Sequence, residues 1–247
     1  MSELDGRVAL VVGASSGIGA ATAELFARSG ARVHAAARRV PRPGNGIEGH
    51  ALDIEGHALD VTDRGAVDAL AREIGALHAL VIAAGTNVPE RTLEVLAPES
   101  WDTLIAVNLT GAFNVVHAFL PALRASRGDV VLIGSVSGSW PDVSGAAYQA
   151  SKAGVLAFAR AAGFELHADG VRFTTVAPGI VDTPILDQRP EPPPAEVRAH
   201  MLRPEDVAAA CLFVVTLPER AHVPELTILP TALQAMGKTN TASPRAK

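Results

Sequence analysis

The chain has 247 residues, of which 48% are hydrophobic and 19% are charged, and its formal net charge is −5. This composition is typical of a globular protein with much buried sheet and excludes an intrinsically disordered chain. The acidic balance excludes the basic surface that binding to nucleic acid or to an anionic membrane needs, so we expect neither as a partner.

The sequence indicates a cytoplasmic protein. Cys211 is the only cysteine, so no intrachain disulfide can form, which suits a reducing compartment. The N-terminal stretch MSELDGR has neither the basic nor the apolar region of a signal peptide. No uninterrupted apolar run reaches the roughly 18 residues of a membrane span.

Short apolar runs alternate with longer helical patterns along the chain. The first run, RVALVVG, is continuous, as expected of a strand that is buried on both faces. The expected strands are 7–13, 31–37, 57–61, 78–85, 128–135, 171–179 and 225–229, and the expected helices are 18–29, 64–75, 99–126, 145–168 and 203–216. This alternation predicts an α/β fold in which helices cover both faces of a parallel sheet.

No break in composition divides the chain, so we expect one domain over residues 1–236. Within it, the stretch DQRPEPPPAEVRAHM (187–201) is too rich in proline for regular structure throughout. It predicts a substrate loop at about 184–202. The polar end, 237–247, predicts a flexible tail.

A glycine-rich turn, VGASSGIG (12–19), joins the first strand to the first helix. Its spacing, G-x3-G-x-G, lets the chain turn tightly and brings backbone N–H groups to a pyrophosphate at a helix N-terminus. No lysine follows the last glycine, so the turn is not a P-loop. An ordinary glycine-rich turn between strand and helix is the alternative.

Tyr148 and Lys152 are four residues apart on a predicted helix and share one of its faces. The lysine charge can stabilise a tyrosinate, and lowering a tyrosine pKa from about 10 to about 7 takes roughly 4 kcal/mol. Ser135 ends the fifth strand at the carboxyl edge of the sheet, where ligands bind in open α/β folds. A surface Tyr–Lys pair is the alternative, but Tyr148 is the only tyrosine in the chain.

Together these features resemble the short-chain dehydrogenase/reductase family over nearly the whole chain. The matching elements are the glycine turn, LDV (59–61), VN (107–108), Ser135, the Y-x3-K pair and APGIVDT (177–183). The resemblance implies a single-domain Rossmann-type three-layer sandwich with a parallel sheet of about seven strands in the order 3-2-1-4-5-6-7.

The resemblance also implies a catalytic set of Asn108, Ser135, Tyr148 and Lys152. In it, Tyr148 exchanges a proton with the substrate oxygen, Lys152 binds the nicotinamide ribose, and Asn108 holds a water. The implied cofactor-binding residues are Gly13, Ser15, Ser16, Gly17, Ile18, Gly19, Arg38, Arg39, Asp60, Val61, Ala84, Gly85, Tyr148, Lys152, Pro178, Gly179, Ile180 and Thr183. The expected substrate-binding residues are Ser135, Ser137, Trp140 and Tyr148, although Trp140 could equally belong to the core or to an interface.

The end of the second strand, AAARR (35–39), indicates which dinucleotide is bound. An NAD site usually places an acid here to bind the ribose 2′-hydroxyl. Ala37 stands at that position and Arg38 follows, and a guanidinium pairs with a 2′-phosphate. We therefore predict NADP(H), with Arg38 as the main contact and Arg39 as a secondary one. Two solvated arginines are the alternative.

Two motifs depart from the family pattern, at three residues in all. Val12 stands where the family has Thr, and IAAG (82–85) where it has NNAG. Both exchanges replace polar groups with apolar ones. If the polar side chains of the family face each other, losing both destabilises the fold less than losing one, because no polar group is left unpaired. We therefore expect the fold to survive.

The leading hypothesis is an NADP-dependent short-chain alcohol dehydrogenase or carbonyl reductase that acts through Ser, Tyr and Lys. GSWP (138–141) and the stretch 216–231 resemble the NADP-dependent serine/3-hydroxy acid dehydrogenases and related carbonyl reductases. Arg189, Arg198 and Arg203 are candidates for binding an acidic substrate. The resemblance implies a homo-oligomer, a dimer or a tetramer built on the two long helices. A catalytically silent dinucleotide-binding regulator, or an epimerase or dehydratase of the same fold, are the alternatives.

A tandem repeat, EGHALDI (48–54) followed by EGHALDV (55–61), fits none of these motifs. We expect the second copy to form the third strand, at the edge of the sheet, and the first copy to be a tolerated insertion. His50 and His57 have no H-x3-H spacing and no cysteine partner, so we expect no metal site.

Overall fold

The computed structural model describes residues 3–40 and 52–233. The strands are β1 (Val8–Val12), β2 (Arg32–Ala37), β3 (Ile54–Ala58), β4 (Ala79–Ile82), β5 (Asp129–Ile133), β6 (Arg172–Pro178) and β7 (Glu225–Ile228). The α-helices are α1 (Gly17–Arg28), α2 (Arg64–Ile74), α3 (Pro98–Ile105), α4 (Gly111–Ser126), α5 (Ala146–Leu166), α6 (Ala195–Arg198) and α7 (Pro204–Val215). The first copy of the repeat, except its last three residues, and the tail 237–247 lie outside the described ranges.

The seven strands form one parallel sheet in the order β3-β2-β1-β4-β5-β6-β7. The predicted fold class and strand order are therefore confirmed. The order reverses between β1 and β4, which is the position where ligands bind in doubly wound sheets.

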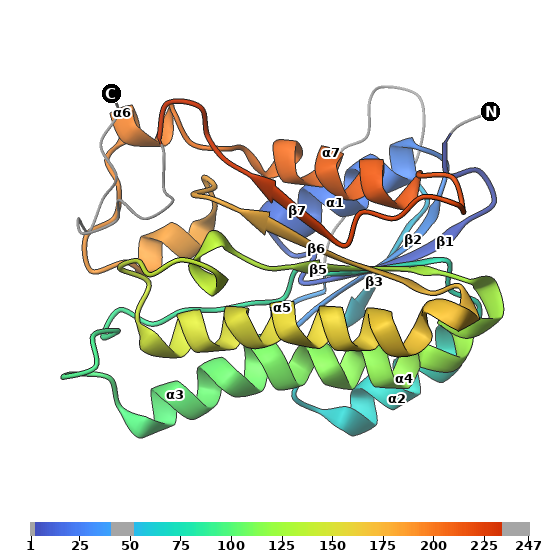
Figure 1. Ribbon diagram of the computed structural model, residues 1–247, viewed down its shortest axis with the longest axis horizontal. Coiled ribbons are helices and arrows are strands. Elements are labelled where there is room, and N and C mark those ends of the chain that lie inside the picture. Colours follow the sequence, from blue (N-terminus) through green and yellow to red (C-terminus); the bar gives the residue numbers. More distant parts are fainter. Residues whose placement is uncertain (1–2, 41–51, 234–247) are drawn as a thin grey trace.

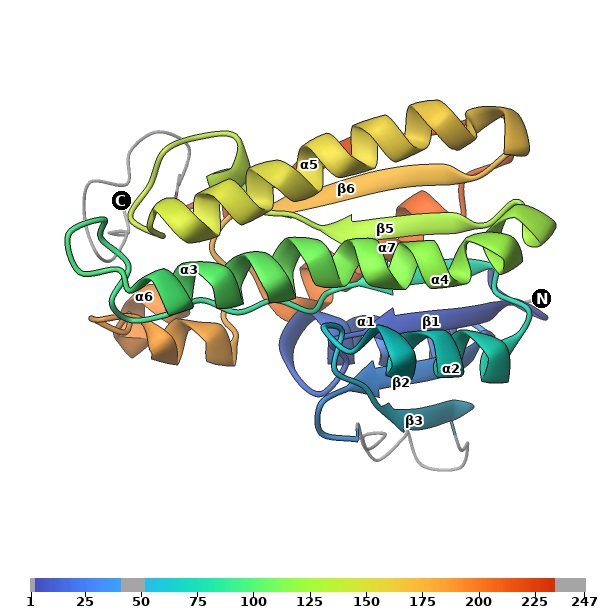
Figure 2. The same ribbon diagram turned by 90° about the horizontal axis from the view of Figure 1, so that it is seen from below.

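Helices cover both faces of the sheet (Figure 1). One core lies between the sheet and the helices α2, α4 and α5, with Phe119 and Phe173 among its largest buried side chains. The other lies between the sheet and the pair α1 and α7, and contains Phe26 and Cys211. Figure 2 shows α5, the α3–α4 pair and α2 lying side by side across one face. Burial of the central strands on both faces explains their continuous apolar sequences.

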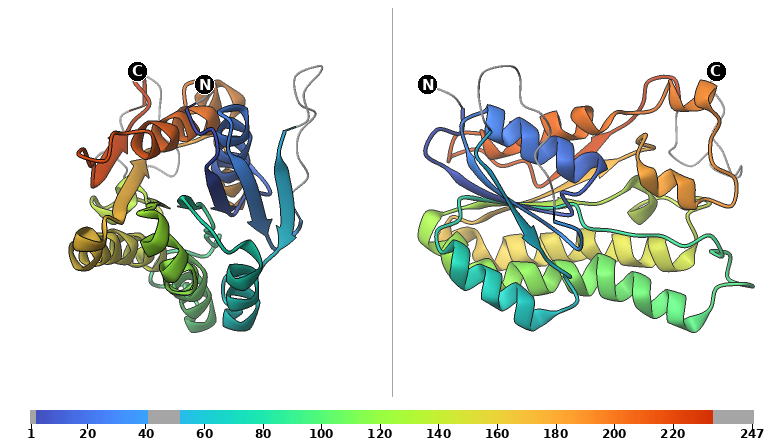
Figure 3. Two further views of the ribbon diagram at one scale, coloured as in Figure 1. Left: turned by 90° about the vertical axis from the view of Figure 1, so that its right-hand side faces the viewer. Right: turned by 180° about the vertical axis from the view of Figure 1, so that it is seen from behind.

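Strand β3 lies at one edge of the sheet, as predicted, and appears in Figure 3 as the teal strand beyond the blue ones. It begins with Ile54 and then uses the second copy of the repeat, as expected, but it ends at Ala58 instead of Val61. The chain turns here because the Asp60 carboxylate accepts hydrogen bonds from the backbone N–H and the hydroxyl of Thr62. Asp63 then caps α2 by accepting from the N–H of Ala66.

The long helix predicted over 99–126 is interrupted by a π-helical turn, Ala106–Thr110, between α3 and α4. Such turns frequently occur at functional sites, and this one contains Asn108. The segment Pro98–Ser126 as a whole is long and apolar enough to cross a membrane. In this fold it supplies buried side chains to the core beside the sheet, as Val115 and Phe119 illustrate, and is a core helix.

The proline-rich segment after β6 contains the 3₁₀ turn Pro184–Gln188 and the single turn of α6. It is held down by a small cluster of apolar side chains, in which Ile180, Leu186, Met201 and Leu233 are buried. The segment lies at the carboxyl ends of the strands and forms one wall of the cavity described below.

Candidate active site

A cavity of about 1010 Å³ opens at the carboxyl ends of the parallel strands. Its walls come from the turn after β1, from the ends of β2, β4, β5 and β6, from the start of α5 and from the proline-rich segment. All 18 residues predicted to bind the cofactor line this cavity, and so do Ser135 and Ser137. Residues that are far apart in the sequence therefore meet in one place.

The glycine turn has the geometry that its spacing predicted. Gly13 has a φ of +90°, and a Cβ at this position would lie 2.5 Å from the backbone nitrogen of Ala84. Val12 and Ile82 are register partners in neighbouring strands, and both side chains belong to the same core. The two departures from the family pattern thus face each other, and neither leaves a polar group unpaired.

Tyr148 lies in the first turn of α5 and lines the cavity together with Ser135, whose side chain is close enough to influence the pKa of the Tyr148 hydroxyl. Ser135 follows β5 and occupies the N-cap of a short 3₁₀ turn, where its Oγ accepts a hydrogen bond from the N–H of Ser137 at 3.1 Å. Two hydroxyl groups therefore meet at one point of the cavity wall. Such a pair can bind one carbonyl or alcohol oxygen.

Lys152 lies one turn further along α5 and is buried. Its Nζ donates a hydrogen bond to the carbonyl oxygen of Ile133 at 2.8 Å and lies 5.8 Å from the centre of the Tyr148 ring. Burial lowers the pKa of Lys152 to about 8. The ammonium is thus held beside the tyrosine, and it loses its proton in a pH range close to neutral.

The pKa of Tyr148 in the chain alone lies above that of a free tyrosine, whereas the lowered pKa is expected with the cofactor bound. Burial raises the pKa of Tyr148 to about 12, although the side chain of Ser135 acts in the opposite direction. The expected lowering relied on the positive charges of Lys152 and of an oxidised nicotinamide ring, and only Lys152 belongs to the chain. Because the pKa of Lys152 is about 8, this lysine is neutral before Tyr148 begins to ionise. The protein groups alone do not sustain a tyrosinate–ammonium pair.

Asn108 is buried in the π-helical turn and does not line the cavity. Its Oδ1 accepts from the N–H of Thr86 at 2.8 Å, and its Nδ2 donates to the Thr86 carbonyl and to Ser151 Oγ, both at 3.0 Å. A Cβ placed on Gly85 would lie 3.6 Å from Asn108 Oδ1 and 3.5 Å from Lys152 Nζ. Asn108 therefore holds the loop after β4 in place, close to Lys152.

Ser137 and Trp140 were both expected to contact substrate, and the structure separates them. Ser137 lines the cavity, and its hydroxyl donates to the carboxylate of Asp142, which also accepts from the N–H of Ser144 at 2.8 Å. Trp140 is half-buried and lies outside the cavity lining. Sequence proximity to Ser135 does not place Trp140 in the site, because the 3₁₀ turn after β5 carries it away.

Arg38 and Arg39 follow the end of β2, are exposed and line the cavity. Asp60 lines the same region, and hydrogen bonds from Thr62 lower its pKa, with a smaller contribution from the charge of Arg38. Ala37 is buried here, so no acidic side chain of β2 reaches this end of the cavity. The region is therefore suited to an anionic group.

Arg91 also lines the cavity, and the sequence analysis missed it. The residue is only 7% exposed; its Nη2 donates to the carbonyl oxygen of Gln188 at 2.8 Å, and its Nε has no hydrogen-bond partner among the residues that the structure describes. Burial and the neighbouring Arg189 lower the pKa of Arg91. Arg91 lies in the irregular segment after β4, where no periodicity distinguishes a buried arginine from a solvated one.

Of the three arginines that were candidates for binding an acidic substrate, Arg189 alone lines the cavity. Arg198 forms an ion pair with Asp182 at 3.0 Å and another with Asp187. Arg203 is exposed at the start of α7. Arg189 is therefore the candidate that the structure retains.

Comparison with known proteins places the chain in a family. The family model for short chain dehydrogenases matches residues 7–193. The cis-4-hydroxycyclohexanecarboxylate dehydrogenase of Sinomonas cyclohexanicum is 38% identical over 229 residues, which cover 85% of this chain and 89% of that protein.

Two solved structures agree with this assignment over almost the whole fold. A metagenomic short-chain oxidoreductase in complex with NADP is 32% identical, with a TM-score of 0.77 over 93% of this chain and 100% of the other. The closed form of a serine dehydrogenase complexed with NADP+ is 29% identical, with a TM-score of 0.83 over 95% of this chain and 99% of the other. The chain belongs to the short-chain dehydrogenase family.

Proposed function

We propose that this protein is an NADP(H)-dependent oxidoreductase that interconverts an alcohol and a carbonyl compound whose carbon skeleton also bears a carboxylate. The observation that carries the proposal is the meeting of Tyr148, Ser135 and Lys152 with the glycine turn in one cavity. Relatives of the chain include a dehydrogenase of a hydroxycarboxylate and a serine dehydrogenase.

The cavity fits a dinucleotide that carries a 2′-phosphate. The glycine turn allows a close backbone approach at the N-terminus of α1, where N–H groups bind a pyrophosphate. Arg38 and Arg39 lie where the ribose 2′ position is expected, and Ala37 leaves no acid there to repel a phosphate. Both solved relatives described above were crystallised with NADP or NADP+.

When bound, the nicotinamide supplies or accepts the hydride. The residues of this chain manage the oxygen and its proton. The Ser135 hydroxyl and the Tyr148 hydroxyl bind the reacting oxygen, and Tyr148 donates its proton during reduction or removes one during oxidation. Lys152 holds a positive charge beside Tyr148 at neutral pH and stabilises the phenolate that reduction leaves behind.

Arg91 and Arg189 support an anionic substrate. Both line the cavity that Tyr148 lines, burial lowers the pKa of each, and the charge of each lowers the pKa of Tyr148. One carboxylate, Asp142, is also near, but it already accepts from Ser137 and Ser144. Within the described part of the chain the Nε of the buried Arg91 has no partner, and a carboxylate ligand would accept a charge-assisted hydrogen bond from it.

A panel of hydroxy acids, keto acids, simple alcohols and simple ketones, followed by NADPH absorbance, tests the activity. Tyr148→Phe should abolish turnover and retain NADPH binding, which fluorescence titration measures. Full turnover by Tyr148→Phe would refute the mechanism. NADPH binding by the wild type without turnover of any compound would instead favour the silent regulator.

A matched pair of substrates tests the anion site separately. Arg91→Gln should lower kcat/KM for a keto acid by roughly 10- to 100-fold, the value of a charged hydrogen bond, and leave kcat/KM for its methyl ester unchanged. Equal losses for acid and ester would assign Arg91 a structural role through its bond to Gln188. A wild type that prefers the ester would refute the carboxylate proposal and leave the oxidoreductase proposal intact.

We also propose that the protein is a cytoplasmic homo-oligomer, a dimer or tetramer, that uses the outer faces of α4 and α5. Phe113 on α4 and Phe164 on α5 are exposed large apolar side chains, and Phe113 also contacts Phe158 on α5. Exposed apolar side chains on neighbouring helices are typical of a protein interface.

The single cysteine, Cys211, is buried in the core and supports a reducing compartment.

A further inference from the structure

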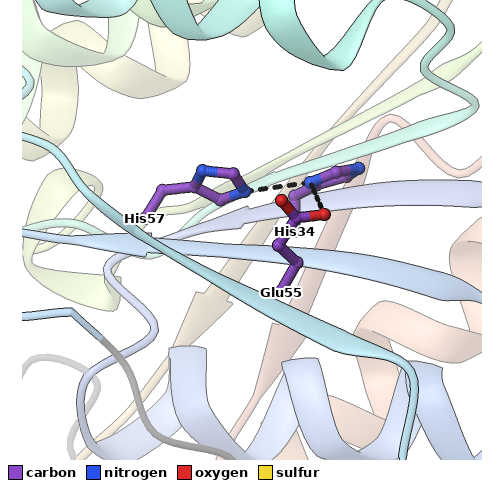
Figure 4. Close-up of side chains that lie close together, drawn as sticks. All are labelled: His34, Glu55 and His57. Atoms are coloured by element: carbon purple, nitrogen blue, oxygen red, sulfur yellow. Dashed lines mark hydrogen bonds and ion pairs between the residues drawn. The ribbon is translucent and has the colours of Figure 1, made fainter.

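A second cluster of chemically active side chains lies on the sheet face that α2 covers, and none of its members lines the cavity. His34 comes from β2, and Glu55 and His57 come from β3. Parallel register pairs His34 with Glu55 and Ala36 with His57. Since alternate residues of a strand share a face, all three side chains lie on the same side of the sheet. Figure 4 shows them turned towards one another.

The ligand atoms of this cluster have the spacing of a metal site. His34 Nδ1 lies 3.0 Å from His57 Nε2 and 3.6 Å from Glu55 Oε2, and the three ligand atoms lie within 4.8 Å of one another. Two ring nitrogens bound to one tetrahedral zinc ion are about 3.3 Å apart. The separation of the two histidine nitrogens is therefore within about 0.3 Å of the spacing that one zinc ion requires.

The surroundings of the cluster support a metal ion as well. The side chains of His34 and His57 are 6% and 9% exposed, whereas that of Glu55 is 47% exposed and gives an ion access from solvent. On the outer side, His57 Nδ1 faces Glu73 Oε1 of α2 at 3.7 Å. A carboxylate on this side of the ring favours a proton on Nδ1, which leaves Nε2 to bind metal.

The local charges also suit a divalent cation. Glu55 and Glu73 carry two negative charges, and Arg32, which binds Glu55 Oε2 at 3.2 Å, carries one positive charge. Without an ion, a single hydrogen bond between the two rings satisfies the pair.

We propose that His34, Glu55 and His57 form a binding site for a divalent transition-metal ion of the zinc class, with Glu73 supporting His57. Imidazole and carboxylate ligands without sulfur suit Zn²⁺, Ni²⁺ and Cu²⁺, and water completes four ligands. The ion joins β2 to the edge strand β3, so its role is structural and does not depend on the proposed function. The sequence analysis compared His57 with His50 only, because nothing in the sequence brings His34 to β3.

The test uses the full-length chain, stripped with a chelator and then desalted. Calorimetric titration should give one Zn²⁺ per chain, Zn²⁺ should raise Tm, and Co²⁺ should give the visible spectrum of a tetrahedral site. His57→Gln and Glu55→Gln should each remove the one-to-one binding, and Glu73→Gln should weaken it about 10-fold. His117→Gln, which changes a histidine of α4 outside the cluster, should bind as the wild type does.

Absence of one-to-one binding in the wild type would overturn the proposal and leave a hydrogen-bonded histidine pair. Wild-type affinity in both His57→Gln and Glu55→Gln would place the ion elsewhere and would also overturn it. If His57→Gln does not fold, Glu55→Gln decides alone, because its side chain is half exposed and the substitution preserves its shape. Loss of the tetrahedral Co²⁺ spectrum in that variant is the supporting result.

Discussion

The ionisation of Tyr148 can be measured directly, because it is the only tyrosine in the chain and tyrosinate absorbance then reports one group. Burial raises its pKa to about 12 from 10.0. This difference amounts to about 3 kcal/mol against the phenolate, and it leaves only about 1% ionised at pH 10, where a free tyrosine is half ionised. Lys152 cannot offset this alone, because its pKa is about 8.

The assay is a pH titration of tyrosinate absorbance with and without saturating NADP+. The chain alone should show almost no tyrosinate up to pH 10, and NADP+ should bring the midpoint below 10. Lys152→Met should move the midpoint with NADP+ back upwards. A midpoint at or below 10 without NADP+ would refute the burial argument. A titration that NADP+ leaves unchanged would refute the assignment of Tyr148 and Lys152 to proton transfer.

Four further predictions follow from other parts of the molecule. Lys152 has a folded pKa of about 8, below the 10.5 of a free lysine, so its burial costs stability at pH 7 and this cost disappears as pH rises from 8 to 10.5. Lys152→Met should therefore raise the free energy of unfolding at pH 7, as measured by urea titration. Removing the buried charge contributes about 3 kcal/mol, and the lost hydrogen bond takes back about 1 kcal/mol. An equal gain in the free energy of unfolding at pH 10.5 would contradict this. Arg38→Ala should lower kcat/KM for NADPH by roughly 10- to 100-fold and spare NADH; equal losses would exclude a 2′-phosphate contact. Deletion of 48–54 should leave a folded, active enzyme by circular dichroism and NADPH oxidation, and a folded but inactive product would assign the first copy a role in the cofactor site. Phe113→Asp should reduce the mass measured by light scattering, and an unchanged oligomer would exclude the α4 face.

Much of the fold could be predicted from the sequence. The continuous apolar runs and the glycine turn follow from local chemistry, because a strand buried on both faces and a tight turn at a helix N-terminus restrict the residues that fit. The strand order, and with it the edge position of β3, was implied by the resemblance to short-chain dehydrogenases, and the second copy of the repeat was assigned to β3 within that fold. The gathering of Ser135, Tyr148, Lys152 and the glycine turn in one cavity follows once that order is known.

Only the tertiary structure decided features that depend on contacts between distant segments. Arg91 enters the cavity from an irregular loop, and the turn after β5 carries Trp140 out of it. The direction of the Tyr148 pKa depends on burial, which no spacing along the sequence measures. The sequence alone does not explain the tandem repeat. The register of β3 beside β2 brings His57 and Glu55 of the second copy to His34, and this contact makes the proposed metal site possible.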